Sequence, residues 1–306
     1  MRVLSGLLHC LILSSAITAA GQQGAASPAQ SAPQAVQTMI HVTVTDRHHR
    51  PVTGLKTENF TLYEDSRQQP ILAVTSDIPA CVGLLVDRSG SMRGKHAAIA
   101  SAMREFVQAG NPANQVFVVT FNDSPYLDQD FTRDPALIER AIAGAEARGG
   151  TAMYDAIIAS VDHLAENKAC GKRVLMIAFD GEDNSSRKSL DYTLHALQTA
   201  GNPLVYAIAL PHPNGPSTTR GRRALESLAA PSGGATFFAG DSGEVPKIAL
   251  KIAEEGRGQY GISYARTKAG HPDVKVEARA PGQGNLAVRG NVASELKLPA
   301  AAAAAQ

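Results

Sequence analysis

Five apolar segments, separated by segments with helical periodicity, constrain the fold of this chain more than any other feature. They lie between Val82 and Gly256. Near-continuous apolar strands that alternate with helices of about three turns indicate a mostly parallel sheet covered by helices on both faces. We therefore predict a doubly wound α/β fold for the centre of the chain. The expected strands are VGLLVD, QVFVVTFN, RVLMIAFD, PLVYAIAL and ATFFA, and the expected helices span residues 95–108, 135–143, 152–166, 190–200, 222–229 and 244–255.

The segments on either side of this centre have a different period. MIHVTVTD, NFTLYED and PILAVTS precede it, and YGISYA, DVKVEARA and NLAVRG follow it, all with the alternation of short antiparallel strands. Each flank offers about three strands, and a sheet that small seldom buries a core of its own. We therefore predict that residues 38–76 and 258–292 form one small β-sandwich, with an α/β domain of residues 77–257 inserted between them.

The two ends of the chain have the composition of segments outside the fold. Arg2 and the apolar stretch that follows it predict a secretory signal peptide over residues 1–20, with a retained membrane anchor as the alternative. Residues 21–37 are rich in Gln, Ala, Ser and Pro, and residues 293–306 are mostly Ala, so both are predicted to be disordered. After signal cleavage no stable membrane span is expected, and the protein is predicted to be secreted or periplasmic.

Charge gives no support for a nucleic-acid or membrane partner. The formal net charge is +1 and only 19% of the residues are charged, so no global field favours a polyanion. The RGRR run at Arg220–Arg223 has no interleaved aromatic residues and is interpreted as a solvated helix face. The sequence also lacks a Walker loop, a dinucleotide fingerprint and a GxSxG motif.

The stretch VDRSGSMRGK places three oxygen-bearing side chains at alternate positions after the first apolar strand. They are Asp87, Ser89 and Ser91, and Gly90 permits a tight turn between them. Ligands of parallel sheets bind beyond the carboxyl ends of the strands, and carboxylate and hydroxyl oxygens suit Mg²⁺ or Mn²⁺. Taken alone, the stretch is equally compatible with Ser89 or Ser91 capping the next helix.

Two later positions extend this pattern. Thr151 follows a Gly pair at an expected helix start, and Asp180 ends the apolar strand RVLMIAFD. With these residues, the region from about Val82 to Gly256 resembles the von Willebrand factor A domain. The metal-ion-dependent adhesion site of that family consists of D-x-S-x-S, a Thr and an Asp in this chain order. The resemblance implies a Mg²⁺ or Mn²⁺ site formed by Asp87, Ser89, Ser91, Thr151 and Asp180.

The same resemblance implies a function. In that family a vacant coordination position of the ion accepts a carboxylate from a protein ligand, so we expect an adhesion or protein-interaction module without catalysis. A metal-dependent hydrolase using the same ion is the alternative, and its nearest candidate bases are Glu182, Asp183 and Asp155. A structural assembly scaffold is a third interpretation. No oligomeric state is predicted.

The flanking segments carry a narrower resemblance. VTVTDRHHRPVTGLKTENFTLYEDSRQQP is similar to the leading segment of the acidobacterial secreted proteins that are related to von Willebrand factor A. Any small immunoglobulin-like module is the alternative interpretation of this segment.

Two cysteines, Cys81 and Cys170, remain after the predicted signal peptide. Each precedes a strand that ends in one of the two acids, and the resemblance implies that these strands are neighbours in the sheet. A disulfide at the end of the sheet opposite to the metal site is therefore expected in an exported chain. Two buried thiols that never meet are the alternative.

Overall fold

The computed structural model describes residues 36–143, 147–212, 219–267, 272–282, 286–290 and 294–295. The predicted signal peptide of residues 1–20 and almost all of the predicted linker and tail lie outside the described residues. Among the described helices, none is long and apolar enough to span a membrane.

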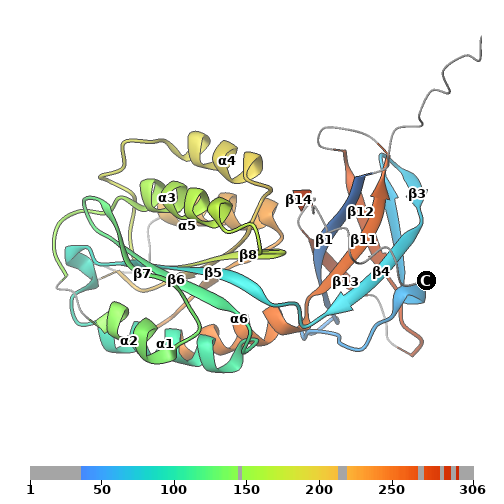
Figure 1. Cartoon of the computed structure of the whole chain (residues 1–306). Helices are drawn as coiled ribbons and strands as arrows, with labels where there is room; N and C mark the ends of the chain where they lie inside the picture. Colours follow the sequence, from blue (N-terminus) through green and yellow to red (C-terminus); the bar gives the residue numbers. More distant parts are fainter. Residues whose placement is uncertain are drawn as a thin grey trace, which may run out of the picture. The chain divides into compact units, whose positions relative to one another are not determined.

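A six-stranded sheet forms the centre of the chain, in the order β10-β9-β8-β5-β6-β7 (Figure 1). Five of its strands are parallel, and they correspond to the five apolar segments. In β5 every residue is buried, as expected for a strand covered on both faces. The parallel strands are β5 (Ala80–Asp87), β6 (Gln115–Phe121), β8 (Lys172–Phe179), β9 (Leu204–Ala209) and β10 (Ala235–Phe238).

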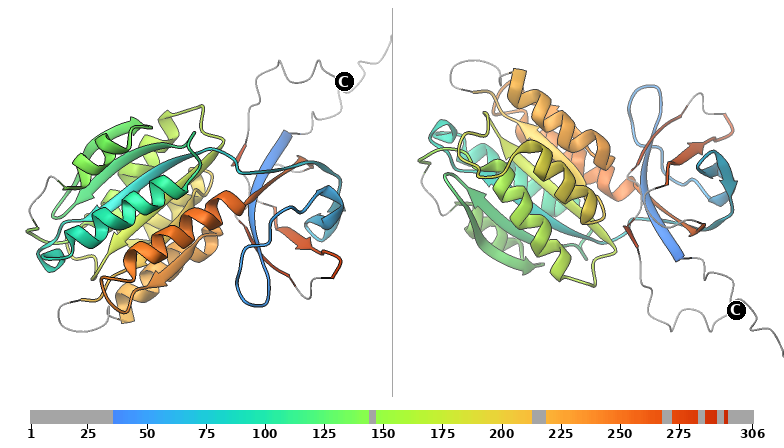
Figure 2. Two further views of the ribbon diagram at one scale, coloured as in Figure 1. Left: turned by 90° about the horizontal axis from the view of Figure 1, so that it is seen from below. Right: turned by 90° about the horizontal axis from the view of Figure 1, so that it is seen from above.

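Helices cover both faces of this sheet (Figure 2). One apolar cluster joins Val82, Leu84 and Val86 of β5 to α1 (His96–Ala109), α2 (Pro135–Ala143) and α6 (Val245–Gly258). The other cluster contains Cys81 and Leu85, and joins the sheet to α3 (Met153–Glu166), α4 (Leu190–Thr199) and α5 (Thr219–Ala229). The short 3-10 turns η2 (Gly90–Met92) and η3 (Ala230–Ser232) complete this unit. The predicted doubly wound fold is confirmed.

Strand β7 (Pro125–Thr132) was not predicted. It pairs antiparallel with β6 at the edge of the sheet. Most of its residues are exposed or half-buried, including Tyr126 and Leu127, which are about half exposed at 53% and 52%. An edge strand that is held mainly by backbone pairing does not need the apolar run by which the other strands were identified.

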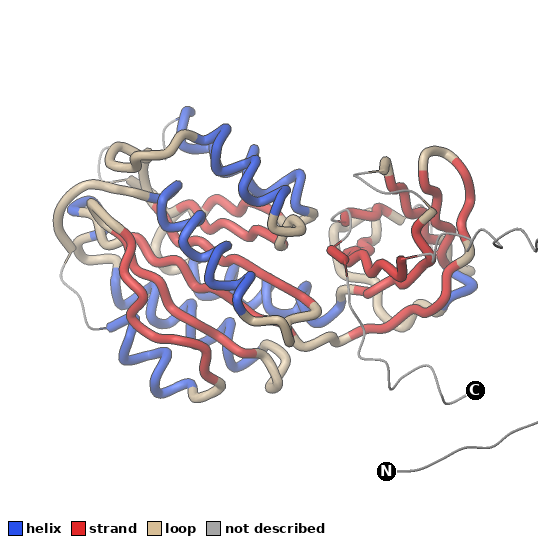
Figure 3. Tube along the Cα trace, turned by 45° about the horizontal axis from the view of Figure 1, so that its top comes forward, coloured by secondary structure: helices blue, strands red, loops and turns tan. Residues whose placement is uncertain are grey.

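Strands from both flanks combine into two further sheets (Figure 3). In the first sheet, β1 (Val36–Thr45) pairs with β11 (Tyr260–Arg266), and β11 pairs with β4 (Ile71–Ser76). In the second sheet, β2 (Phe60–Glu64) lies between β3 (Arg67–Gln69) and β12 (Val274–Ala278). The turn η1 (Thr57–Asn59) precedes β2. Each sheet therefore contains strands from before and after the α/β unit, so the predicted insertion into one β-sandwich is confirmed.

A shared core holds the sandwich together. Ile40, Leu62 and Ile262 are at most 2% exposed, and the Phe60 and Tyr260 rings meet edge to face with centroids 5.1 Å apart. These side chains come from both sheets and from both flanks. Neither flank could bury this core by itself, because each supplies only part of its apolar surface.

Two strand ends extend into segments that were predicted to be disordered. Strand β1 begins at Val36, inside the predicted linker of residues 21–37, and β14 (Ser294–Glu295) lies inside the predicted tail of residues 293–306. Both β14 and β13 (Ala287–Gly290) pair with β1. Backbone hydrogen bonds to an existing strand order these residues without requiring apolar side chains, which is why composition did not reveal them.

The chain enters and leaves the α/β unit at one place. Asp77, just before β5, forms a salt bridge of 2.9 Å with Arg257 near the end of α6, and its amide donates to the Arg257 carbonyl over 3.2 Å. This junction lies at the start of β5, whereas Asp87 lies at its end. The two connections to the sandwich are thus at the opposite end of the sheet from the polar loop.

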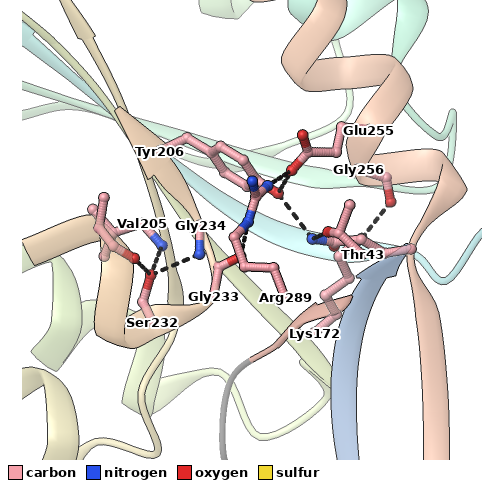
Figure 4. A network of polar contacts seen from close by, with 12 residues as sticks. Thr43, Lys172, Val205, Tyr206, Ser232, Gly233, Gly234, Glu255, Gly256 and Arg289 are labelled. Atoms are coloured by element: carbon pink, nitrogen blue, oxygen red, sulfur yellow. Dashed lines mark hydrogen bonds and ion pairs between the residues drawn. The ribbon is translucent and has the colours of Figure 1, made fainter. Parts of the chain in front are cut away.

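A buried polar network lies next to this junction (Figure 4). The Tyr206 hydroxyl donates to Glu255 over 2.6 Å, and Glu255 also pairs with Arg289 of β13. The Gln259 amide donates to the Tyr206 hydroxyl over 2.8 Å and to the Thr43 hydroxyl over 3.1 Å. Burial raises the pKa of Tyr206 well above its usual value, so the phenol stays protonated and donates. The network links β9 and α6 to strands of the sandwich.

Cys81 and Cys170 form a disulfide with their Cα atoms 5.6 Å apart. Cys81 is the second residue of β5, and Cys170 lies two residues before β8. The predicted bridge, and its position at the end of the strands opposite to Asp87 and Asp180, are confirmed.

Candidate functional site

Two acidic side chains meet at the carboxyl edge of the sheet. Asp87 is the last residue of β5, and Asp180 directly follows the last residue of β8. The two strands are parallel neighbours with Val86 opposite Ala178, so their ends lie side by side. Asp87 is 0% exposed and Asp180 is 1% exposed. A buried carboxylate pair of this kind needs compensating donors or a cation.

The two serines connect the acids through a chain of hydrogen bonds. The Ser89 amide donates to Oδ1 of Asp87 over 2.7 Å. The Ser89 and Ser91 hydroxyls are 3.0 Å apart, and the Ser91 hydroxyl donates to Oδ1 of Asp180 over 2.7 Å. Neither serine caps α1, whose N-cap residue is Lys95. Four of the five predicted residues therefore belong to one polar cluster, and the capping alternative does not hold for α1.

Thr151, the fifth predicted residue, lies on a loop that contacts this cluster through the backbone. The Gly90 amide donates to the Gly149 carbonyl over 3.2 Å. Thr151 is 4% exposed, and its amide donates to Oδ1 of Asn184 over 2.8 Å, which ties it to the loop after Asp180. A Cβ added at Gly150 would lie 2.2 Å from the Ser185 hydroxyl, so these two loops approach too closely for a side chain there.

Asp87 has one carboxylate oxygen without a protein partner. Among the described residues, its Oδ2 is buried and accepts no hydrogen bond. Burial raises the pKa of Asp87 to about 7, and nearby Asp180 acts in the same direction. A bound cation would supply the missing compensation, so the donor set fits a hard divalent ion.

The donors are mainly hydroxyls. Within the described part of the chain, no three His, Cys, Asp or Glu side chains gather as a metal-binding group. The cluster instead combines two carboxylates with the hydroxyl-bearing residues Ser89, Ser91 and Thr151. Few charged ligands leave an ion with net positive charge, which attracts a further anionic ligand.

Lys95 is part of the site and was missed by the sequence analysis. Its ammonium group forms a salt bridge with Oδ2 of Asp180, and the side chains are 12% and 1% exposed. The only sequence signal is a lysine four residues after Ser91, at the start of α1. Such a lysine is usually solvated, so its contact with an acid 85 residues away could not be deduced from spacing.

Arg88 holds the loop between Asp87 and Ser89 in place. It is 7% exposed, its guanidinium donates to the Ala141 carbonyl over 2.6 Å, and it lies 3.6 Å from a carboxylate oxygen of Asp128. Its own amide donates to the Phe121 carbonyl over 2.7 Å. The loop is thereby attached to β6, β7 and α2.

Two of the candidate bases hold neighbouring loops. Oδ2 of Asp183 accepts from the Tyr154 amide over 2.9 Å and from the Ser186 hydroxyl over 2.6 Å. The Asp155 carboxylate accepts from the Arg187 and Lys188 amides over 2.9 and 3.1 Å. Both acids are therefore occupied as acceptors for backbone groups.

Comparison with known proteins agrees with this geometry. Residues 82–182 match the sequence model of the von Willebrand factor type A domain. The central α/β unit has the fold of a von Willebrand factor A domain. The A domain and its flanks resemble the von Willebrand factor type A protein from Catenulispora acidiphila, at 13% identity and a TM-score of 0.51 over 85% of this chain and 74% of that one. No curated protein sequence matches the chain.

A second solved structure resembles the A domain. Proximal thread matrix protein 1 from the mussel byssus, in a form whose metal-ion-dependent adhesion site is occupied by zinc, is 18% identical with a TM-score of 0.52. The match covers 64% of this chain and 50% of that one, so this chain spans about half the length of the mussel protein. At these identities, both likenesses show the fold.

Proposed function

We propose that this protein is an adhesion or protein-interaction module that binds an acidic group of a protein partner through a divalent cation. The observation that carries the proposal is the hydrogen-bonded chain from Asp87 through Ser89 and Ser91 to Asp180, with one buried oxygen of Asp87 left without a partner among the described residues. The residues that would hold the ion are Asp87, Ser89, Ser91, Thr151 and Asp180.

Mg²⁺ or Mn²⁺ is the cation that these oxygen donors suit best. When bound, the ion would act as an electrophile toward a carboxylate of the partner. The serine and threonine hydroxyls are neutral donors, so they would leave more positive charge on the ion than additional carboxylates would. The protein's own contribution is to hold these donors at the carboxyl ends of β5 and β8 and to bury both acids.

The site supports binding better than hydrolysis. A metal-dependent hydrolase needs a base that is free to accept a proton, whereas Asp155 and Asp183 accept hydrogen bonds from backbone amides of neighbouring segments. A scaffold role without a metal would leave the buried Oδ2 atom of Asp87 without a partner among the described residues. Both alternatives are therefore weaker proposals.

The disulfide supports an extracytoplasmic location. Structural disulfides persist in the periplasm and outside the cell and are rare in reducing compartments. The Cys81–Cys170 bridge therefore agrees with the proposed signal peptide of residues 1–20 and with a secreted or periplasmic protein. The metal-binding module would then meet its partner outside the cytoplasm. The similarity of the flanks to acidobacterial secreted proteins remains part of the same proposal.

The direct test combines metal titration with a carboxylate surface. We expect calorimetry to detect one Mg²⁺ site on the full chain, and we expect the protein to bind a glutamate-coated biosensor in Mg²⁺. Chelation with EDTA should abolish the sensor signal and restored Mg²⁺ should recover it. Absence of Mg²⁺ binding in calorimetry, or equal sensor binding in EDTA, would contradict the proposal.

Replacement of Lys95 by methionine should strengthen metal binding. The Lys95 ammonium neutralises buried Asp180, so an incoming cation competes with it for the same carboxylate. Removal of this positive charge should lower the Kd for Mg²⁺ by about tenfold. Exposed Arg93 provides the matched control, since Arg93→Met removes a charge from the same region without removing a contact to Asp180. Equal Mg²⁺ affinities of the two variants in calorimetry would refute this competition.

A further inference from the structure

A surface hollow of about 700 Å³ lies beside the proposed metal site. It is bordered by the start of α3, by the segment between β8 and α4, and by the first turns of α5; we refer to it as the basic groove. Asn184 connects the two places, because it lines the groove and accepts a hydrogen bond from the Thr151 amide over 2.8 Å. The residues used below are Tyr154, Asp183, Lys188, Leu190, Arg220 and Arg223.

Three cations dominate the charge of the basic groove. Lys188, Arg220 and Arg223 line it and are exposed. In the part of the chain that the structure describes, none of them forms a salt bridge with an acid. Asp183 is the acidic residue of the lining, and its carboxylate already accepts from Tyr154 and Ser186. The described lining therefore carries three positive charges against the one negative charge of Asp183, so its net charge is positive.

The arginine run of α5 is not a uniform solvated face. Arg222 lies over the Phe238 ring, 3.7 Å from its centroid, and is only partly exposed. Arg220 and Arg223 are three residues apart and so lie on one side of α5. Lys188, on the segment between β8 and α4, also lines the hollow, and its ammonium lies 4.4 Å from the centroid of the Tyr192 ring. Two separate segments thus contribute cations to one hollow.

We propose that the basic groove binds a second acidic side chain of the partner whose first carboxylate binds the metal. This inference rests on the proposed function and specifies its partner as an acidic polypeptide segment. Arginine forms planar, bidentate hydrogen bonds with carboxylates. Tyr154 and Leu190 add apolar surface on which the methylene groups of Asp or Glu side chains can pack. Metal and groove would together select segments with at least two acids.

The probe is a synthetic peptide with alternating Asp and Gly residues, and its matched control carries Asn in place of Asp. Binding to the full chain is measured by fluorescence anisotropy in Mg²⁺ and in EDTA, at low and high NaCl. The test variant is the double substitution Arg220→Glu and Arg223→Glu. Lys247→Glu is a single charge reversal away from the groove and serves as the control, since Lys247 is exposed on α6, which covers the other face of the sheet.

We expect the Asp peptide, but not the Asn peptide, to bind the wild type in Mg²⁺, and high NaCl to weaken binding because exposed charges are screened. The double variant should weaken peptide binding about tenfold and retain wild-type Mg²⁺ affinity in calorimetry. Lys247→Glu should change peptide affinity less than twofold. Cooperative thermal unfolding of each variant shows that the fold is intact.

The outcomes separate this inference from the proposed function. Equal peptide affinity of the double variant and Lys247→Glu would contradict acid binding in the groove. Failure of the Asp peptide to bind a wild type that binds Mg²⁺ would contradict it as well. Neither outcome would contradict the proposed metal site. Dextran sulfate that competes as strongly as the peptide would also overturn the groove proposal, because the groove would then take polyanions in general. Arginine-dependent peptide binding that is identical in Mg²⁺ and EDTA would support the groove and contradict the metal proposal.

Discussion

Replacement of Asp87 by alanine is expected to lower the Mg²⁺ affinity of the full chain by at least about 100-fold. Asp87 is buried at the end of β5, and its Oδ2 atom has no protein partner among the described residues. Its Oδ1 atom also orients the Ser89 amide. The substitution thus removes negative charge from the centre of the site and loosens the loop that carries both serines. Calorimetric titration with MgCl₂ measures the change.

The fold itself should tolerate this substitution. Burial disfavours the ionised form of the Asp87 carboxyl group when no cation is bound, and it thereby raises the pKa of Asp87 to about 7. Its removal therefore offsets the lost hydrogen bond to Ser89, and the free energy of unfolding in EDTA should change by less than about 2 kcal/mol. Asp162→Ala removes an exposed acid from α3 and serves as the control. Equal Mg²⁺ affinities of the two variants would show that Asp87 does not hold a Mg²⁺ ion.

Loss of the disulfide is the second large effect that we expect. The bridge joins residues 89 positions apart, and the chain-entropy model assigns roughly 4 to 5 kcal/mol to a loop of this length. The double variant Cys81→Ala and Cys170→Ala should lose about this much free energy of unfolding, measured by urea denaturation of the oxidised protein. A reducing agent should destabilise the wild type by a similar amount and leave the double variant unchanged.

The position of the bridge gives this prediction a second readout. Cys81 lies near the start of β5, whereas Asp87 lies at its end. Mg²⁺ affinity should therefore change less than threefold in the double variant under conditions where it remains folded. A loss of stability below about 1 kcal/mol would show that the bridge contributes little. A large fall in Mg²⁺ affinity would show instead that the two ends of the sheet are coupled.

The sequence by itself determined the architecture of the α/β unit. Strands β5, β6, β8 and β9 are almost entirely buried and mostly apolar, and β10 is half-buried, which makes all five visible as apolar runs in the sequence. The sandwich followed from a similar argument, since two short sets of alternating strands could not each bury a core. The five proposed metal residues were assigned through the resemblance to the D-x-S-x-S, Thr and Asp positions of the von Willebrand factor A family, since the stretch after β5 is by itself equally compatible with a helix cap.

Tertiary structure alone decided the features that depend on polar or edge residues. Strand β7 pairs through its backbone at the sheet edge, so its exposed side chains carry no apolar pattern. The contact between Lys95 and Asp180 depends on the direction of one long side chain after the turn at η2. The basic groove exists because the segment around Lys188 and the first turn of α5 line the same hollow. Such contacts between surface loops arise from how helices pack on the sheet, and residue spacing does not encode that packing.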